Sequence, residues 1–101
     1  MKLNSSERII ETIMQNISLF DSFDKVYLFG SILKKKSLMN DIDILLIFSQ
    51  YTDKLLDDLN IIDSCFKELC GLPIDLTVLS IEEEKDTDFL TKISSYLKIK
   101  G

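Results

Sequence analysis

FGSILKKKSLMNDIDILLIF, residues 29–48, contains the end of one predicted strand, a lysine-rich connection and the whole of a second strand, residues 41–48. Side chains of a strand alternate between its two faces. In the second strand both faces are apolar beyond the opening acidic residues, which is typical of a central, buried strand. The sequence therefore predicts a sheet with residues 41–48 in its interior.

The flanking sequence alternates between helix and strand patterns. Apolar residues at helical spacing predict helices at residues 5–20, 53–70 and 81–95. Short apolar runs predict further strands at residues 25–29, 74–79 and 96–100. Gly71 is expected to cap the second helix, and Pro73 blocks its continuation. This order predicts one domain, residues 1–101, of the α/β (α+β two-layer) class, with a small mixed β-sheet packed against helices.

Two of the predicted strands, 41–48 and 74–79, carry acidic residues at their starts. The helix that connects them favours parallel pairing, because an antiparallel hairpin needs only a few residues. Parallel neighbours bring their N-terminal ends side by side. Asp41 and Asp43 are therefore expected next to Asp75.

These three carboxylates form a candidate metal site. Asp41 and Asp43 face the same way, so they repel each other unless a cation lies between them. Asp43 also lies at the edge of the buried strand, where an unpaired ionised group is costly. Hard oxygen ligands suit Mg²⁺ or Mn²⁺. With Asp75, the cluster is expected to hold two ions and to support in-line displacement at phosphorus.

A candidate phosphate site precedes the acids. Gly30 has no Cβ and lets the backbone approach a phosphate closely. Ser31 offers a hydroxyl and an N–H at the start of a predicted helical turn, which favours anions. Lys34 is the lysine expected to contact a triphosphate, since it lies one turn beyond Ser31. Each feature alone is also typical of a turn, a strand start or a solvated loop, and it is their order at one end of the sheet that favours a function.

Composition limits the classes of function. The net charge of −5 argues against a basic nucleic-acid-binding surface, so nucleic acid is not expected as a direct ligand. The longest apolar run is too short to cross a bilayer, so no membrane partner is expected. Cys65 and Cys70 fit neither a disulfide nor a zinc pattern, which favours a reducing, cytoplasmic location.

The sequence resembles the DNA polymerase beta-like nucleotidyltransferase superfamily. That family has a strand ending in Gly-Ser, a short spacer, Asp-x-Asp and a later strand with a third acid. Here nine residues separate Ser31 from Asp41, and PIDLTVL carries the third acid. The resemblance implies that Gly30 and Ser31 hold the β and γ phosphates of ATP. It also implies that Asp41 and Asp43 bind two catalytic Mg²⁺ ions, and that Asp75 ligates one of them and helps deprotonate the acceptor hydroxyl.

One departure from the family concerns the residues after Gly-Ser. Many minimal members continue x-Ala-Arg-Gly, whereas this chain has Ile32-Leu33-Lys34-Lys35. Lysine keeps the positive charge but lacks the bidentate fork of arginine. The phosphate geometry and the nucleotide preference are therefore expected to differ, while the metal site is not affected.

The chain looks most like the minimal nucleotidyltransferases, which lack the acceptor-binding helical domain of larger relatives. Minimal members are commonly antitoxins that adenylylate a tyrosine of a HEPN ribonuclease toxin. The resemblance thus implies Mg²⁺-dependent transfer of AMP from ATP to a hydroxyl of a HEPN-type partner in a hetero-oligomer. Two alternatives stay open: the same fold acting on a small-molecule or RNA acceptor, and a non-catalytic antitoxin that neutralises its partner by contact.

Overall fold

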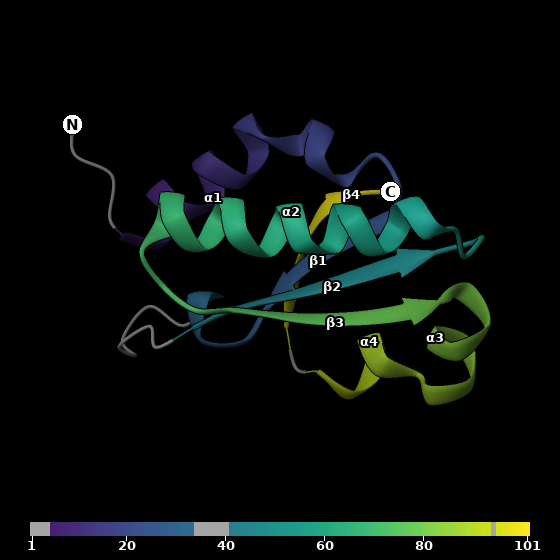
Figure 1. Cartoon of the computed structure of the whole chain (residues 1–101). Coiled ribbons are helices and arrows are strands. Elements are labelled where there is room, and N and C mark those ends of the chain that lie inside the picture. The colour runs from purple at the N-terminus through teal and green to yellow at the C-terminus, as the bar shows by residue number, and fades with distance from the viewer. Residues whose placement is uncertain (1–4, 34–40, 94) are drawn as a thin grey trace.

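A four-stranded mixed sheet is the centre of the computed structural model, which describes residues 5–33, 41–93 and 95–101 (Figure 1). Its strands are β1 (Lys25–Phe29), β2 (Ile42–Phe48), β3 (Ile74–Ser80) and β4 (Tyr96–Lys100), in the order β3-β2-β1-β4. β2 pairs parallel with β3 and antiparallel with β1, and β4 pairs antiparallel with β1. The predicted central strand and the predicted parallel pairing are both confirmed.

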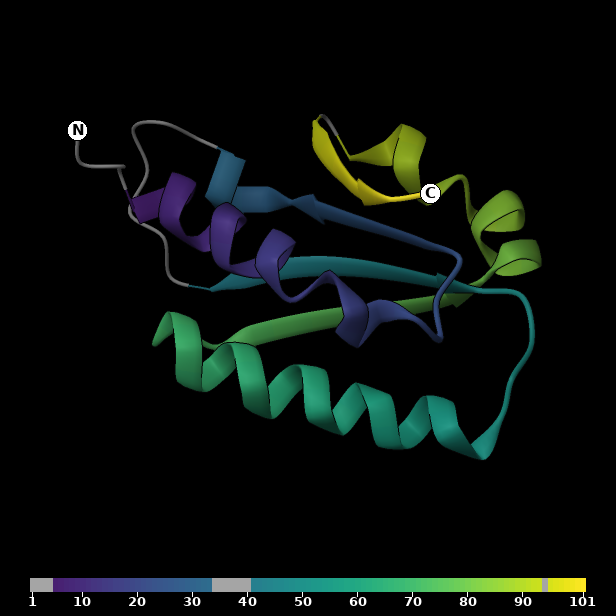
Figure 2. The same cartoon turned by 90° about the horizontal axis from the view of Figure 1, so that it is seen from above.

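The long helix α2 (Asp53–Cys70) makes the crossover between β2 and β3. It lies on the same face of the sheet as α1 (Ser5–Gln15) and the 3-10 turn η1 (Ile17–Phe20), as Figure 2 shows from above. Gly71 ends α2 in the left-handed conformation, with φ of 70°, and its N–H donates to the carbonyl of Lys67 at 3.0 Å. The predicted glycine cap is therefore confirmed.

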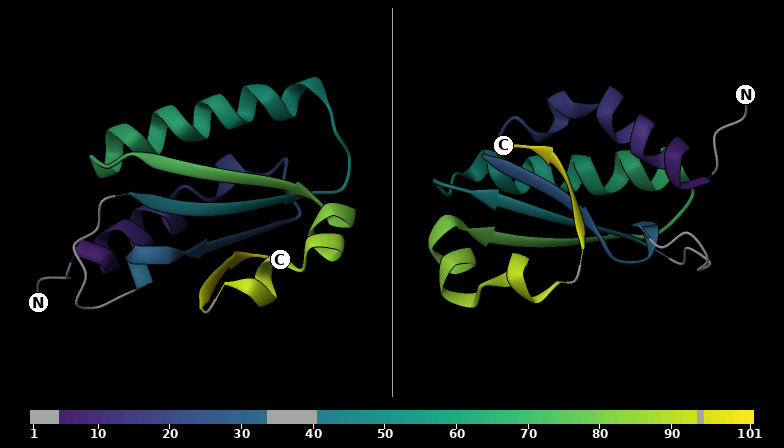
Figure 3. Two further views of the ribbon diagram at one scale, coloured as in Figure 1. Left: turned by 90° about the horizontal axis from the view of Figure 1, so that it is seen from below. Right: turned by 180° about the vertical axis from the view of Figure 1, so that it is seen from behind.

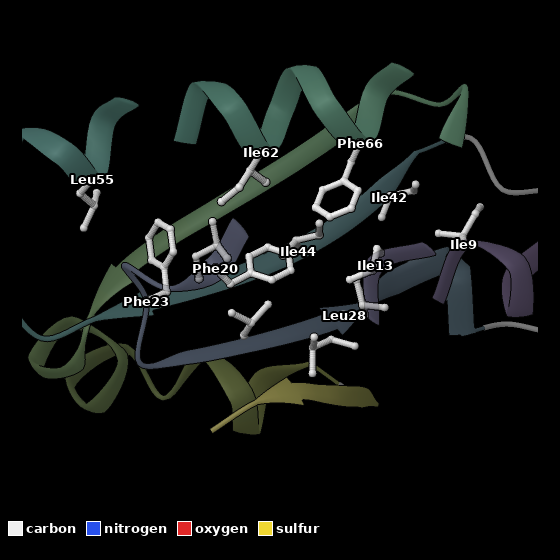
Figure 4. Packing of buried hydrophobic residues seen from close by; sticks show 13 residues of the cluster. Ile9, Ile13, Phe20, Phe23, Leu28, Ile42, Ile44, Leu55, Ile62 and Phe66 are labelled. Carbon is white, nitrogen blue, oxygen red and sulfur yellow. The ribbon is translucent and has the colours of Figure 1, made fainter. Parts of the chain in front are cut away.

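The main hydrophobic core fills the space between these helices and the sheet (Figure 4). Phe66 of α2 stacks on Phe20 of η1, with ring centroids 5.6 Å apart, and both rings are fully buried. Ile44 and Leu46 meet them from β2. This packing fixes α2 over the sheet and thereby holds β2 and β3 in their parallel register.

Two shorter helices cover part of the opposite face (Figure 3). They are α3 (Ile81–Thr87) and α4 (Phe89–Lys92), which pack with Tyr27, Leu45 and Ile47 of the sheet. Ser80 caps α3, since its Oγ accepts from the N–H of Glu83 at 3.0 Å. The architecture is the expected α+β arrangement, to which α3 and α4 add a partial layer.

Two predicted helices are shorter than the apolar pattern indicated. The segment 81–95 is not one helix, because Asp88 adopts φ of 54° and separates α3 from α4. The segment 5–20 leaves the α conformation after Gln15, where the side chain of Asn16 donates to the carbonyl of Thr12 at 2.8 Å. Short polar side chains that bond to the backbone in this way compete with the helical pattern. None of the helices in the described ranges is both long and apolar enough to cross a membrane.

Candidate active site

The parallel pairing of β2 with β3 brings the three predicted acids together. Asp43 and Asp75 are direct partners in the register, and the Ile42 N–H donates to the Pro73 carbonyl at 2.9 Å where the ladder begins. Asp41 precedes β2 by one residue. One carboxylate oxygen of each acid lies within 4.8 Å of the other two. The arrangement that the crossover predicted is therefore present in the fold.

The acids lie at the N-terminal end of β2 and β3. Asp43 shares its sheet face with Leu45 and Ile47, the face on which α3 and α4 pack. Since α3 begins directly after the C-terminal end of β3, it covers the far end of that face, and α4 runs back from it toward Phe29 (Figure 3). Asp75 is exposed, whereas Asp41 and Asp43 are half-buried. The cluster is thus open to solvent on the side of Asp75.

Asp43 is the electrostatically strained member of the cluster. Burial, with the charges of Asp41 and Asp75, raises the pKa of Asp43 from 3.8 to about 6. A hydrogen bond to Asp75 contributes to this rise, because it stabilises the protonated form of Asp43. Without a cation, protonation of Asp43 below about pH 6 reduces the repulsion.

The donor set fits a divalent metal. Three hard oxygen donors within 4.8 Å of one another, with uncompensated negative charge at Asp43, are the chemistry that Mg²⁺ and Mn²⁺ prefer. A bound cation compensates the negative charge of Asp43, which at lower pH a proton neutralises. Among the residues that the structure describes, Asp41, Asp43 and Asp75 are therefore the group that can hold a metal.

The predicted phosphate-binding residues follow β1, next to the acids. Gly30 begins the 3-10 turn η2 (Gly30–Leu33) with φ of 80°, and Ser31 comes next in that turn. The predicted helical turn after Gly-Ser is thus present, in 3-10 form. Gly30 packs against the carboxylate of Asp43, a contact that the spacing of the motif did not indicate. Lys34, the predicted triphosphate contact, lies outside the described residues.

A pair of aromatic residues that the sequence analysis did not assign to the site includes one member beside Asp43. Phe29 is the cross-strand partner of Asp43, and Phe89 of α4 packs edge-on against it with ring centroids 5.5 Å apart. A side chain directly opposite on a neighbouring strand shares its face. The Phe29 ring therefore places apolar surface next to Asp43, and Phe89 extends that surface on α4. The location of these two rings depends on the strand register and on the position of α4. No local sequence motif indicates either of these.

The raised pKa of Asp43 predicts a measurable effect on stability. Between about pH 4 and pH 6 the folded protein retains a proton that the unfolded chain loses, so stability falls as pH rises through this window. Above about pH 6 the folded protein bears the full cost of an ionised Asp43. Because the group is partly solvated, we expect Asp43→Asn to stabilise the metal-free protein at pH 7.5 by only about 1 kcal/mol.

The measurement is thermal unfolding in chelator at pH 4 and pH 7.5. The expected gain of Asp43→Asn over wild type, a few degrees in Tm, appears at pH 7.5 and disappears at pH 4. Asp57→Asn is a suitable control, since Asp57 is exposed on α2. An equal Tm difference at both pH values would contradict a raised pKa of Asp43 in the folded protein.

Comparison with known proteins agrees with this geometry. The sequence profile of the family described as polymerase beta, nucleotidyltransferase matches residues 7–98. No curated protein matches the chain in sequence. Among solved structures, the chain resembles a candidate nucleotidyltransferase from Sulfolobus solfataricus, with a TM-score of 0.56 and 23% identity, over 93% of this chain and 81% of the other.

Two toxin–antitoxin structures share the fold as well. One is the tri-AMPylated HEPN toxin of Shewanella oneidensis in complex with its MNT antitoxin, with a TM-score of 0.60, 14% identity and coverage of 95% and 72%. The other is a mutant of the toxin–antitoxin pair MntA–HpeT, with a TM-score of 0.55, 17% identity and coverage of 98% and 74%. At these identities the likeness establishes the fold.

Proposed function

Because the chain belongs to the polymerase beta nucleotidyltransferase family, we propose that it transfers AMP from ATP to a hydroxyl of a partner protein. The partner we propose is a HEPN-type toxin, which the transfer silences. The observation that carries the proposal is the cluster of Asp41, Asp43 and Asp75. A chain that only bound its partner would have no need of three mutually repelling carboxylates at one end of the sheet.

The proposed chemistry is an in-line displacement at the α-phosphorus of ATP. Asp41, Asp43 and Asp75 would hold two Mg²⁺ ions, which, when bound, neutralise charge on the triphosphate and on the leaving group. The acceptor oxygen forms a bond to the α-phosphorus, and the bond from that phosphorus to the bridging oxygen of the β-phosphate breaks. Pyrophosphate leaves, and AMP stays on the acceptor.

Each site residue has a proposed part in this step. The turn that begins at Gly30 and Ser31 follows β1 directly beside the acids, which suits it to hold the β and γ phosphates. Asp75 is the proposed acceptor of the hydroxyl proton. Since it is the exposed member of the cluster, a hydroxyl on another protein can reach it from outside. The sequence contains no histidine, so a carboxylate is the proposed base.

The choice of a toxin as acceptor rests on the structural relatives. The Shewanella oneidensis complex joins a protein of this fold to a HEPN toxin that carries AMP groups. The match covers 95% of this chain and 72% of the other chain. These facts favour a HEPN-type protein over a small molecule or an RNA as the acceptor.

The test is the intact mass of a co-expressed HEPN-type partner after incubation with the purified chain and Mg-ATP. We expect a gain of one or more AMP units on the partner, and none when ATP or Mg²⁺ is omitted. Labelled ATP with small-molecule and RNA acceptors serves as the comparison. Labelling of one of these acceptors in place of the protein would overturn the proposed acceptor. It would still support nucleotidyltransferase activity.

A further inference from the structure

Gly30 lies where a side chain would collide with a proposed metal ligand. A Cβ built on Gly30 would overlap a carboxylate oxygen of Asp43 and lie only 3.1 Å from its Cγ. The overlapped atom is an oxygen of the Asp43 carboxylate, which is half-buried and hydrogen-bonded to Asp75. The space beside Gly30 is therefore filled by the Asp43 carboxylate.

Strand register explains this contact. Phe29 is the direct partner of Asp43 across β1 and β2, so Gly30 is the first residue beyond the paired end of β1. With φ of 80°, the chain turns there into η2, and this left-handed conformation is one that residues with a Cβ adopt rarely. The turn thus brings the unsubstituted Cα of Gly30 up against the acid.

We infer that Gly30 is a positioning residue for Asp43. The missing Cβ leaves the space in which the Asp43 carboxylate turns toward Asp41 and Asp75, so that the three acids converge. This role rests on the proposed metal-dependent function, and it is distinct from the approach of a phosphate to the glycine backbone. A side chain at position 30 displaces the carboxylate and weakens metal binding even when no nucleotide is present.

Gly71 provides a matched control within the same chain. Its φ of 70° is close to the 80° of Gly30, but nothing lies within 4 Å of a Cβ built on it. Alanine at either position introduces left-handed strain, and only alanine at position 30 also meets a carboxylate. A difference between Gly30→Ala and Gly71→Ala therefore isolates the steric effect on Asp43.

The first measurement is Mn²⁺ binding to the full chain without nucleotide, by electron paramagnetic resonance of the free ion. We expect Gly71→Ala to bind Mn²⁺ as wild type does, and Gly30→Ala to bind at least about tenfold more weakly. Equal affinity in Gly30→Ala and wild type would overturn the inference. Failure of wild type itself to bind Mn²⁺ would instead overturn the proposed metal site.

The second measurement does not depend on a metal. Thermal unfolding in chelator compares Gly30→Ala in the wild-type and Asp43→Ala backgrounds. We expect Gly30→Ala to lower Tm more than Gly71→Ala does in the wild type, and by the same amount once the carboxylate is removed. The Cβ of Asp43 would be 3.5 Å from the new methyl group, which is ordinary contact. An excess loss that persists in the Asp43→Ala background would contradict the positioning role.

Discussion

Replacing Asp41 and Asp43 together by Asn is expected to lower the rate of the proposed AMP transfer by at least about a thousandfold, or roughly 4 kcal/mol of transition-state stabilisation. Asparagine keeps the size of each side chain but removes the negative charge that a divalent cation requires. The two acids and Asp75 have oxygens within 4.8 Å of one another and form one cluster. Groups that act as a unit are not additive, so Asp43→Asn alone is expected to lose nearly as much.

The measurement is the initial rate of partner modification followed by intact mass. Asp57→Asn, on the exposed face of α2, is the charge-matched control for Asp43→Asn alone. Stable complex formation by the double variant shows that the partner-binding surface is intact. Loss of neutralisation with the complex intact indicates that chemistry silences the partner. Full neutralisation by a variant that transfers no AMP would favour the alternative in which contact alone is sufficient.

Phe66→Ala is expected to cost about 3–5 kcal/mol of unfolding free energy. The ring is fully buried and stacks on Phe20, so its removal leaves a cavity between α2 and η1 that the sheet cannot fill. The total stability of a small domain is about 5–15 kcal/mol, and the variant is therefore close to the limit of folding. Loss of this packing also loosens α2 over β2 and β3, on which the acid cluster depends.

Leu69→Ala is the matched control for this prediction. Leu69 lies on the same helix, less than one turn beyond Phe66, but 54% of its surface is exposed. Its truncation is expected to change stability by less than about 0.5 kcal/mol. Urea unfolding of both variants at neutral pH provides the comparison. Similar losses for the two would mean that the aromatic stack does not hold α2 in place.

Most of the fold was predictable because its signals are local. The apolar runs gave all four strands, and the helical spacing with Gly71 gave α2 and its end. The proximity of Asp43 to Asp75 was predictable for a different reason. A long helical connection favours parallel pairing, and parallel neighbours bring their N-terminal ends together. The chain thus carried enough information to place three carboxylates at one edge of the sheet.

The ends and breaks of the other helices were not predictable from periodicity. The apolar spacing in residues 5–20 and 81–95 continues past the points where Asn16 and Asp88 leave the helical conformation. Those breaks depend on one backbone conformation each, and they are stabilised by packing of the following segment on the sheet. An amphipathic pattern records which residues are buried and says little about how the backbone turns between them.

The sequence alone therefore determined the class of the fold, the order of its strands along the chain and the acids that meet on β2 and β3. Tertiary structure added the surroundings of those acids. Contact of Gly30 with Asp43 requires both the antiparallel register of β1 with β2 and a φ of 80° at one residue. The raised pKa of Asp43 arises from burial and from charges on another strand. The Gly30 contact and the pKa of Asp43 both depend on distances between residues that are far apart in the sequence. Those distances are set only when the chain has folded.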